Sequence, residues 1–285
     1  MSNTLRLHDE PSHADDAIFL AGARAADRGS MSDLQQLMGF NGGESPLERG
    51  APLPMRRLHA GDTLFHEGAA AEAIYFIRAG TFKSYRTAED GYEQVLGFAG
   101  RAEVLGFDAV CMEFHPTAAV ALEESSVYVV LVRDLFTSAQ RIPALDRIVA
   151  LAVSRALTQR GELADLMAAV AAEVRLARFL MQLSVRMEAC GQSPRRFHLR
   201  MSRRDIASHL GVAHETVSRS FSALAGWGVV DVNNREVEIL DMDRLRALAR
   251  STRGQIDEPH KPNGLGLSLV HAARGHEVAA HHAVN

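Results

Sequence analysis

The sequence predicts a chain of the α+β class, in which a β-rich N-terminal part is followed by helices. Three observations support this prediction. Short runs of apolar and β-branched residues, separated by turn residues, occupy positions 53–135. An apolar repeat at three- and four-residue steps, which is typical of a helix, continues over residues 139–171. Two shorter helical repeats that flank Gly211 are followed by a pair of short strand-like runs before residue 250.

Composition limits the class of protein. The chain has 285 residues, of which 47% are hydrophobic and 23% charged, as is usual for a globular protein of two domains. No apolar run reaches the roughly 18 residues that a membrane span needs. The N-terminus lacks the basic and apolar segments of a signal peptide. We therefore expect a cytoplasmic protein without a membrane partner.

The net charge of −4 hides a basic segment near the C-terminal end. Residues 1–50 carry 4 basic and 8 acidic side chains, whereas residues 195–250 carry 10 basic and 7 acidic ones, a net charge of +3. The basic segment opens with five arginines between Arg195 and Arg204. A local excess of positive charge favours a polyanionic partner, although the whole chain is acidic.

The β-rich part contains five strand-like runs, which are DTLFHEG (62–68), AIYFIRAG (73–80), TFKSYRT (81–87), QVLGFAG (94–100) and SVYVVLV (126–132). Asp90-Gly91 predicts a tight hairpin turn between the third and fourth runs. Strands at this spacing favour a closed sandwich or barrel. Before them, residues 32–40 predict a short helix with Ser32 as its N-cap.

Residues 139–171 predict one long helix. About 30 residues at ~1.5 Å each make a rod of about 45 Å, which is longer than a small domain buries. A second apolar stripe on such a rod can pack against the same helix of another copy, so a homodimer is expected. The alternative is a single packing helix. A further helix follows and ends at Gly191.

The segment 201–232 predicts a helix-turn-helix. Ser202 can cap a first helix, and Gly211 stands where that helix must end and the chain must turn. The second helix starts near Ala213 and carries Val217, Phe221 and Leu224 on one face. The strand-like runs VVDV and EVEIL, joined by Asn233-Asn234, then predict the hairpin wing of a winged helix.

The polar face of the second helix suits the major groove of DNA. Arg219 can donate two hydrogen bonds to guanine, Glu215 can accept one from cytosine, and Ser218 can bond a base edge. The alternative is an ordinary surface ion pair between Glu215 and Arg219, which are four residues apart. The arginines at 195–204 would then hold the fold on DNA phosphates.

Several motifs together resemble the CRP/FNR family of bacterial transcription regulators, and most of all its FNR/FixK branch. They are GDTLFHEG (61–68), AIYFIRAGTFKSYRT (73–87), EDGYEQVLGF (89–98), VLGFDAV (104–110), HPTAAVALEES (115–125), SPRRFHLRMSRRDIASHLG (193–211) and ETVSR (215–219). The resemblance covers about residues 32–250.

The resemblance implies a domain order. It consists of a flexible N-terminus (1–30), a jelly-roll-like β-roll of the cyclic-nucleotide-binding type (31–138), a dimerisation helix (139–171), a winged helix-turn-helix (172–250) and a flexible tail (251–285). It implies an activator of transcription, with double-stranded DNA, RNA polymerase and a second copy of the chain as partners, and no catalytic residues.

The resemblance also implies roles for named residues. Glu215, Ser218 and Arg219 would read each half of a palindrome resembling TTGAT-N4-ATCAA. The residues expected to position DNA phosphates are Arg200, Arg203, Arg204, His214 and Ser220.

Departures from the family argue against its usual effectors. Residues 1–50 contain no cysteine and Tyr128 replaces the cysteine of the β-roll, so a [4Fe–4S] cluster would lack its thiolates. An ungapped alignment places Arg160 where the oxygen sensors carry an acidic residue in the dimer helix. No arginine lies between Arg101 and Arg133 to hold the phosphate of cyclic AMP. We therefore predict no cofactor and no metal.

Two alternatives remain. A haem-dependent, nitric-oxide-sensing regulator of the same family could use His59, His66 or His115. A β-barrel metal enzyme is the alternative from another class, although the chain contains no His-x-His motif and no nucleophile or phosphate-loop motif. Cys111 and Cys190 are interpreted as structural cysteines.

Overall fold

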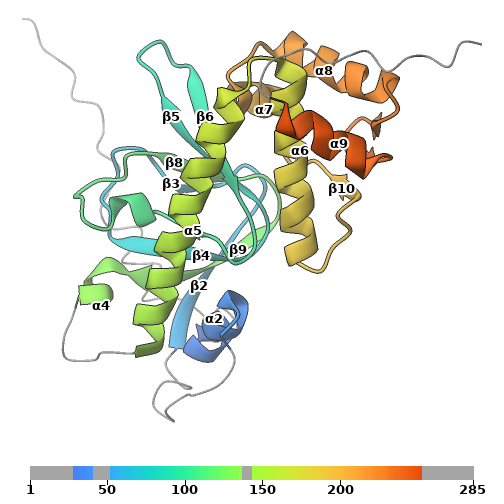
Figure 1. The fold of residues 1–285 in the computed structure, drawn as a ribbon. Coiled ribbons are helices and arrows are strands. Elements are labelled where there is room, and N and C mark those ends of the chain that lie inside the picture. Colours follow the sequence, from blue (N-terminus) through green and yellow to red (C-terminus); the bar gives the residue numbers. More distant parts are fainter. Residues whose placement is uncertain (1–27, 41–51, 137–142, 252–285) are drawn as a thin grey trace, which may run out of the picture. The chain divides into compact units, whose positions relative to one another are not determined.

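The computed structural model describes residues 28–40, 52–136 and 143–251, and the structural statements below concern these residues. Figure 1 shows a β-rich part, the long helix α5 and a helical C-terminal part that follow one another along the chain. The predicted α+β class is confirmed. The segments predicted to be flexible are 1–30 and 251–285, and of these residues 1–27 and 252–285 lie outside the described residues.

Two antiparallel sheets build the β-rich part. The first has the strand order β1-β2-β9-β4-β7 and the second has the order β3-β8-β5-β6. The strands are β1 (Arg28–Ser30), β2 (Pro52–Leu58), β3 (Thr63–Phe65), β4 (Ala73–Ala79), β5 (Phe82–Thr87), β6 (Glu93–Ala99), β7 (Val104–Leu105), β8 (Ala118–Ala121) and β9 (Ser125–Leu131).

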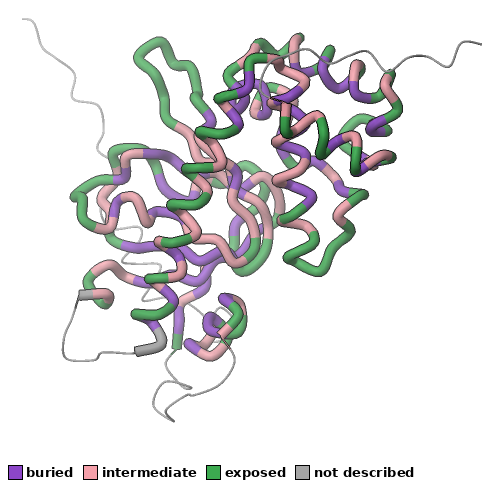
Figure 2. The backbone as a smooth tube through the Cα atoms, viewed as in Figure 1, coloured by how far each residue is buried: buried purple, intermediate pink, exposed green. Residues whose placement is uncertain are grey.

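The two sheets pack on each other through a shared apolar core. Ile77 and Val127 of the first sheet are fully buried together with Phe82 of the second. Burying such side chains stabilises the fold by about 1.5–3 kcal/mol each. This packing agrees with the predicted sandwich, and we refer to it as the β-roll (Figure 2).

The predicted hairpin is present, and the two sheets also contain strands that were not predicted. β5 and β6 pair on either side of Gly91, whose φ of 80° is left-handed. β1, β2, β7 and β8 were not predicted, and β1 corrects the prediction that residues 28–30 are flexible, because they pair with β2. β2 contains Pro52 and Pro54, which weaken the strand signal but are tolerated because they pair only with the short edge strand β1. β7 and β8 are too short to show a pattern.

The first described helix, α2 (Met31–Met38), is capped by Ser30 rather than by Ser32 as predicted. The hydroxyl of Ser30 accepts from the N–H of Asp33 at 3.1 Å, and the carboxylate of Asp33 accepts from the N–H of Ser30 at 2.8 Å. Ser32 is not the cap because the helix already begins at Met31, so Ser32 lies inside its first turn.

The long helix is shorter than predicted. α5 spans Pro143–Ala168, and residues 139–142 lie outside the described part. Its 26 residues correspond to about 39 Å. The helix α5 ends at Ala168. The next helix, α6 (Ala172–Ala189), begins after Ala171, whose backbone is extended. The short helices η2 (Phe107–Ala109) and α4 (Val132–Phe136) precede α5.

The C-terminal part contains α7 (Arg203–Leu210), α8 (His214–Gly226) and α9 (Met242–Arg250). Beside them lies a three-stranded sheet in the order β10-β12-β11, formed by β10 (Arg196–His198), β11 (Val230–Asn233) and β12 (Glu236–Ile239). The wing hairpin is confirmed, although its turn is at Asn234 and Arg235. β10 and α9 were not predicted.

Candidate nucleic-acid interface

Ser202 begins the first helix of the helix-turn-helix, as predicted. Its hydroxyl accepts from the N–H of Asp205 at 3.1 Å, while the carboxylate of Asp205 accepts from the N–H of Ser202 at 2.9 Å. The helix α7 ends at Leu210 because Gly211 adopts the left-handed conformation, with φ 62°. These local interactions set the turn between α7 and α8.

The apolar face of α8 points into the core. Val217, Phe221 and Leu224 are at most 4% exposed and share one buried cluster with Ile206 and Leu210 of α7. The predicted stripe is confirmed. Because this face fixes the rotation of α8 about its axis, the opposite face must point to solvent.

The three residues predicted to read bases, Glu215, Ser218 and Arg219, are all exposed on α8. The hydroxyl of Ser218 donates to the carbonyl of His214 at 3.3 Å. Within the described residues, Glu215 and Arg219 form no ion pair with each other or with another side chain. The surface ion pair considered as the alternative is therefore absent, and both charged groups are available to a ligand.

A basic hollow lies beside the start of α8. It has a volume of about 470 Å³ and is lined by Arg203 and Arg204 of α7, by His214, and by Asn234 and Arg235 of the wing turn. Three of the five residues predicted to position phosphates thus lie together. The N-terminal end of α8, at His214, adds backbone N–H groups and a partial positive charge to this hollow.

Arg203 is anchored more firmly than the other cations of the hollow. Its guanidinium lies 3.5 Å above the ring of Phe221, and Nη2 donates to the carbonyl of Asn234 at 2.9 Å. Nη1 is buried without a hydrogen-bond partner, and burial lowers the pKa of Arg203. Arg203 is thus fixed in place between α8 and the wing turn.

The other two predicted phosphate contacts lie elsewhere. The hydroxyl of Ser220 is buried and donates to the carboxylate of Glu173 on α6 at 3.3 Å, so Ser220 faces the core. Arg200 is exposed, but its Nε lies 3.1 Å from the carboxylate of Glu123 in the β-roll. Neither residue lines the basic hollow.

Sequence reasoning missed the contribution of the wing turn. Asn234 and Arg235 line the hollow although they lie far along the chain from α7. The available signal was the basic residue next to the Asn233-Asn234 turn, since a wing tip with an arginine is placed to reach a phosphate.

A second cavity, of about 590 Å³, lies between the β-roll and the helices α5 and α6. Apolar side chains dominate its lining, among them Phe98, Leu105 and Leu157. Its cations, Arg160 and Arg186, come from the helices. The β-roll instead contributes Asp108, so this cavity lacks the β-roll arginine that would hold a cyclic phosphate.

The described residues include no group of three or more His, Cys, Asp or Glu side chains arranged to hold a metal ion. Cys111 and Cys190 are exposed free thiols. In the same part of the chain, no helix is long and apolar enough to cross a bilayer.

The histidines of the haem alternative have other contacts. His59 is exposed and its Nδ1 lies 2.9 Å from the carboxylate of Glu124. The ring of His115 is buried and stacks on Phe65 with the ring centroids 4.0 Å apart. His66 is exposed.

Two family models match the chain. The model described as a cyclic nucleotide-binding domain matches residues 55–140, and the model described as a Crp-like helix-turn-helix domain matches residues 174–248. The first covers most of the β-roll, and the second covers α6 to α9.

Individual proteins give the same assignment. The chain is 36% identical over 194 residues to the transcriptional activator protein Anr of Pseudomonas protegens, covering 68% of this chain and 80% of Anr. It is 36% identical over 196 residues to the fumarate and nitrate reduction regulatory protein of Salmonella typhimurium, covering 69% and 78%. The structure of FixK2 from Bradyrhizobium japonicum has a TM-score of 0.62 and 26% identity, covering 70% of this chain and 98% of that one.

These relatives are regulators of transcription, so the metal-enzyme alternative is wrong. The two family models match the β-roll and the winged helix-turn-helix of this chain. The chain belongs to the CRP/FNR family of transcription regulators.

Proposed function

We propose that this regulator binds, as a dimer, a palindrome resembling TTGAT-N4-ATCAA and controls genes of anaerobic, microaerobic or nitrogen-oxide-linked metabolism. The observation that carries the proposal is the pair of exposed, unpaired side chains Glu215 and Arg219 on α8, beside a hollow lined by arginines. The relative from Salmonella typhimurium is named a fumarate and nitrate reduction regulatory protein, and this name supports the proposed control of anaerobic metabolism. We also propose that the regulator recruits RNA polymerase and that it is located in the cytoplasm, where the DNA is.

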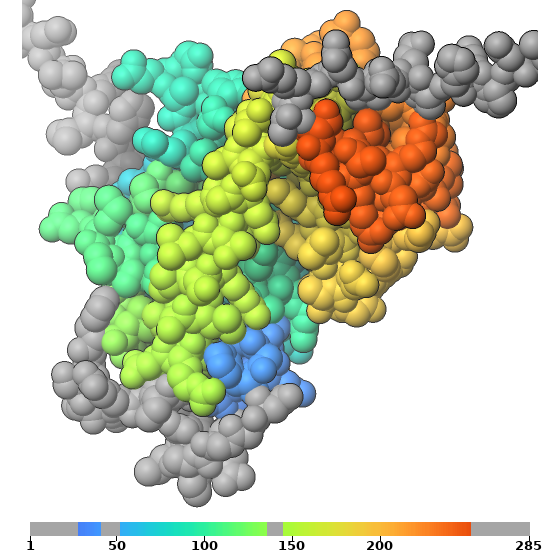
Figure 3. Space-filling view, viewed as in Figure 1, coloured from blue at the N-terminus to red at the C-terminus, as the bar shows by residue number. Residues whose placement is uncertain are grey.

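The surface of α5 supports a dimer. A stripe of small and apolar residues recurs there at three- and four-residue steps, formed by Ala150, Val153, Leu157, Gly161, Ala164 and Ala168. Leu157 is 65% exposed. Figure 3 shows that α5 lies uncovered along the surface of the single chain. Such a stripe suits a second helix, and Gly161 would let the two backbones approach closely.

Replacement of Leu157 by alanine is expected to raise the dissociation constant of the dimer by about tenfold, or roughly 1.4 kcal/mol, because apolar area at the helix pair is lost. Sedimentation equilibrium measures this constant. Thr158→Ala, which changes an exposed neighbour outside the stripe, serves as the control. Equal constants for the Leu157 variant and the natural chain would contradict this dimer.

Replacement of Arg204 by alanine is expected to weaken binding to all DNA sequences alike, since Arg204 would contact a phosphate. The slope of log affinity against log salt should fall by about 1 for each protomer. Fluorescence anisotropy on the palindrome and on an unrelated duplex measures both quantities. Arg246→Ala removes an exposed arginine of α9, which pairs with Asp243 at 3.0 Å, and should change neither. A loss confined to the palindrome would mean that Arg204 reads a base.

We also propose that the regulator works without an iron–sulfur cluster, a cyclic nucleotide or haem. Tyr128 is buried where the family expects a cysteine, and the two thiols of the chain are exposed on separate elements. The β-roll side of the 590 Å³ cavity is acidic at Asp108. A cyclic phosphate would meet this carboxylate instead of a guanidinium.

Binding by purified, iron-free protein in air tests the whole proposal. A duplex with the palindrome should be bound at least about a thousandfold more tightly than a duplex with scrambled half-sites. Mapping of bound sites across the genome with and without oxygen would give the motif and the genes. Equal affinity for the two duplexes, or a strict need for anoxic cluster assembly, would overturn the proposal.

A further inference from the structure

A short connection joins the winged helix to α5. It consists of residues 169–171, which belong to neither α5 nor α6. Its middle residue, Val170, is 77% exposed and so contributes little packing. The helices α6 to α9 share one buried cluster, so a change of a few backbone dihedrals in the connection would move them as one body. The angle between α5 and α8 is therefore set by contacts outside the connection.

Two arginines of α6 reach back to the end of α5. Arg175 and Arg178 are three residues apart and lie on the same side of the helix. Nη1 of Arg178 donates to the carbonyl of Asp165 in the last turn of α5. Nε of Arg175 donates to the carbonyl of Ala169, just beyond that helix, at 2.8 Å.

The same two arginines also hold other helices of the winged helix. Nε and Nη2 of Arg178 donate to the carbonyls of Ala249 at 2.8 Å and Ser251 at 2.9 Å, at the C-terminal end of α9. Nη1 of Arg175 donates to the carbonyl of Leu210, the last residue of α7, at 2.8 Å. We call Arg175 and Arg178 the arginine pair.

All five of these carbonyls lie at or next to the C-terminal end of a helix. The last four carbonyls of a helix have no partner within it, and the negative end of the helix dipole favours a cation. A guanidinium carries five N–H donors in a fixed plane, so one arginine can bond two helix ends and hold them at a set angle. The ammonium of a lysine lacks this fixed geometry.

Apolar packing supports the same attachment. A Cβ at Gly211 would lie 3.2 Å from Cε of Met167, so the turn between α7 and α8 lies against α5. Leu166 of α5 is fully buried in the cluster that contains Phe221 and Leu224 of α8. The end of α5 is thus packed into the core of the winged helix.

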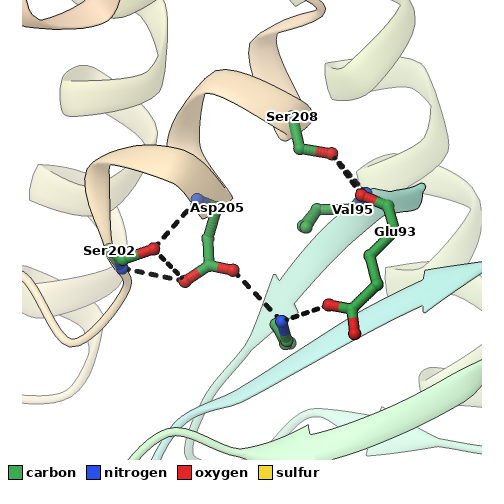
Figure 4. A network of polar contacts seen from close by, with 6 residues as sticks. Glu93, Val95, Ser202, Asp205 and Ser208 are labelled. Atoms are coloured by element: carbon green, nitrogen blue, oxygen red, sulfur yellow. Dashed lines mark hydrogen bonds and ion pairs between the residues drawn. The ribbon is translucent and has the colours of Figure 1, made fainter. Parts of the chain in front are cut away.

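Contacts with the edge strand β6 hold α7 at a second place. The hydroxyl of Ser208 accepts from the N–H of Val95 at 2.8 Å and donates to the carbonyl of Glu93 at 2.8 Å (Figure 4). The ammonium of Lys83 on β5 lies 3.1 Å from the carboxylate of Asp205 on α7. Because the winged helix is attached both to α5 and to the β5–β6 hairpin, it cannot turn freely about residues 169–171.

We infer that the arginine pair determines which separation of the two half-sites the dimer accepts. Two copies joined along α5 would carry two α8 helices, and the angle between α5 and each winged helix sets the distance between them. One base pair more or less between the half-sites shifts the second half-site by about 3.4 Å along the DNA and turns it by about 35°. A rigid dimer matches one spacer, whereas a dimer that pivots accepts several. The inference rests on the proposed dimer and its palindrome.

The test compares Arg178→Met with Arg244→Met in the full-length protein. Both variants remove a half-buried arginine that bonds a helix end, but Arg244 donates to the carbonyl of Trp227 at 2.7 Å, within the winged helix. Anisotropy titrations on palindromes with spacers of three to six base pairs measure the preference. We expect the preference for four over five base pairs to fall about fivefold in Arg178→Met, because hydrogen bonds between α5 and α9 are lost. Arg244→Met should keep the natural preference, and an unchanged preference in Arg178→Met would overturn the inference.

Discrimination at the half-site guanine separates positioning from a general loss of structure. It should be the same in Arg178→Met and in the natural chain, since each winged helix keeps its own core. Loss of this discrimination together with the spacer preference would place the defect in α8 and overturn the inference. If Arg178→Met fails to fold, as judged by the fluorescence of Trp227, Arg178→Lys keeps the cation and should lose spacer preference in the same direction.

Distances between spin labels test the pivot without DNA. Labels at Thr158→Cys on α5 and Ser222→Cys on α8, both exposed positions, report the angle between the helices once the two natural cysteines are replaced by serine. With an excess of unlabelled chain, the distance distribution should be about twice as broad in Arg178→Met as with the natural arginine. Equal widths would overturn the inference. Equal affinity of the natural chain for the palindrome and for a scrambled duplex would instead overturn the proposed function alone.

Discussion

Replacement of Arg219 by alanine is expected to abolish discrimination at the half-site guanine, at a cost of about 1–3 kcal/mol for each half-site. Two half-sites in a dimer would then lose about 2–6 kcal/mol of specific binding, if the half-sites contribute independently. The physical reason is that Arg219 is exposed on α8 and has no carboxylate partner in the described structure, so its guanidinium can donate both hydrogen bonds to one base.

The control for Arg219 keeps its charge. Arg219→Lys retains a cation for phosphates but loses the planar pair of donors, so it should lose discrimination nearly as fully as the alanine variant. Anisotropy titrations on the palindrome and on duplexes with the guanine exchanged measure the difference. Normal discrimination by the alanine variant, with weaker binding to every duplex, would mean that Arg219 contacts phosphate rather than guanine.

Acidification is expected to destabilise the winged helix through His209. The imidazole is 7% exposed, lies between the rings of Phe98 and Phe179, and has an Nδ1 without a hydrogen-bond partner. Burial lowers the pKa of His209 from 6.5 to about 4, although a hydrogen bond with the backbone of Val95 opposes the shift. The nearby cation Arg186 lowers the pKa further.

The pH window follows from these two pKa values. Below about pH 6.5 the unfolded chain takes up a proton at this site and the folded chain does not, so stability falls as the pH drops. The loss is complete near pH 4 and amounts to about 3 kcal/mol, at roughly 1.4 kcal/mol for each pH unit. Burial would raise the pKa of Asp205, but hydrogen bonds from Ser202 and Lys83 hold it below its ordinary value of 3.8. The protonation of Asp205 therefore changes the stability mainly at pH values below this window.

Urea titrations between pH 7 and pH 4, followed by the fluorescence of Trp227, measure the effect. Trp227 is the single tryptophan of the chain and packs against the core of the winged helix. His209→Phe keeps an aromatic ring but cannot take up a proton, so its stability should lose about 3 kcal/mol less over this range. Equal pH dependence of the two proteins would assign the acid sensitivity to other groups.

The helix-turn-helix could be predicted because its determinants are local. Ser202, Gly211 and the spacing of Val217, Phe221 and Leu224 act within a few residues of one another. The exposed positions of Glu215 and Arg219 follow from the same spacing, because the buried stripe fixes the rotation of the helix.

Two predicted phosphate contacts show where local reasoning fails. Ser220 follows Arg219 directly, but one residue turns a helix by 100°, which carries Ser220 to the side that faces Glu173. The partner of Arg200 is Glu123 of the β-roll, and no pattern near Arg200 indicates it. The strand β10 was missed for a similar reason, since its three residues are defined by their pairing with β12.

The sequence by itself determined the α+β class, the family, the helix-turn-helix and the residues that face solvent on α8. Only the tertiary structure decided that Arg203, Arg204 and His214 share one hollow with the wing turn, and that α7 covers the edge of β6. The reason is the separation of the partners along the chain. Ser208 and Val95 are 113 residues apart and Lys83 and Asp205 are 122 apart, so their hydrogen bonds exist only once the two parts have packed.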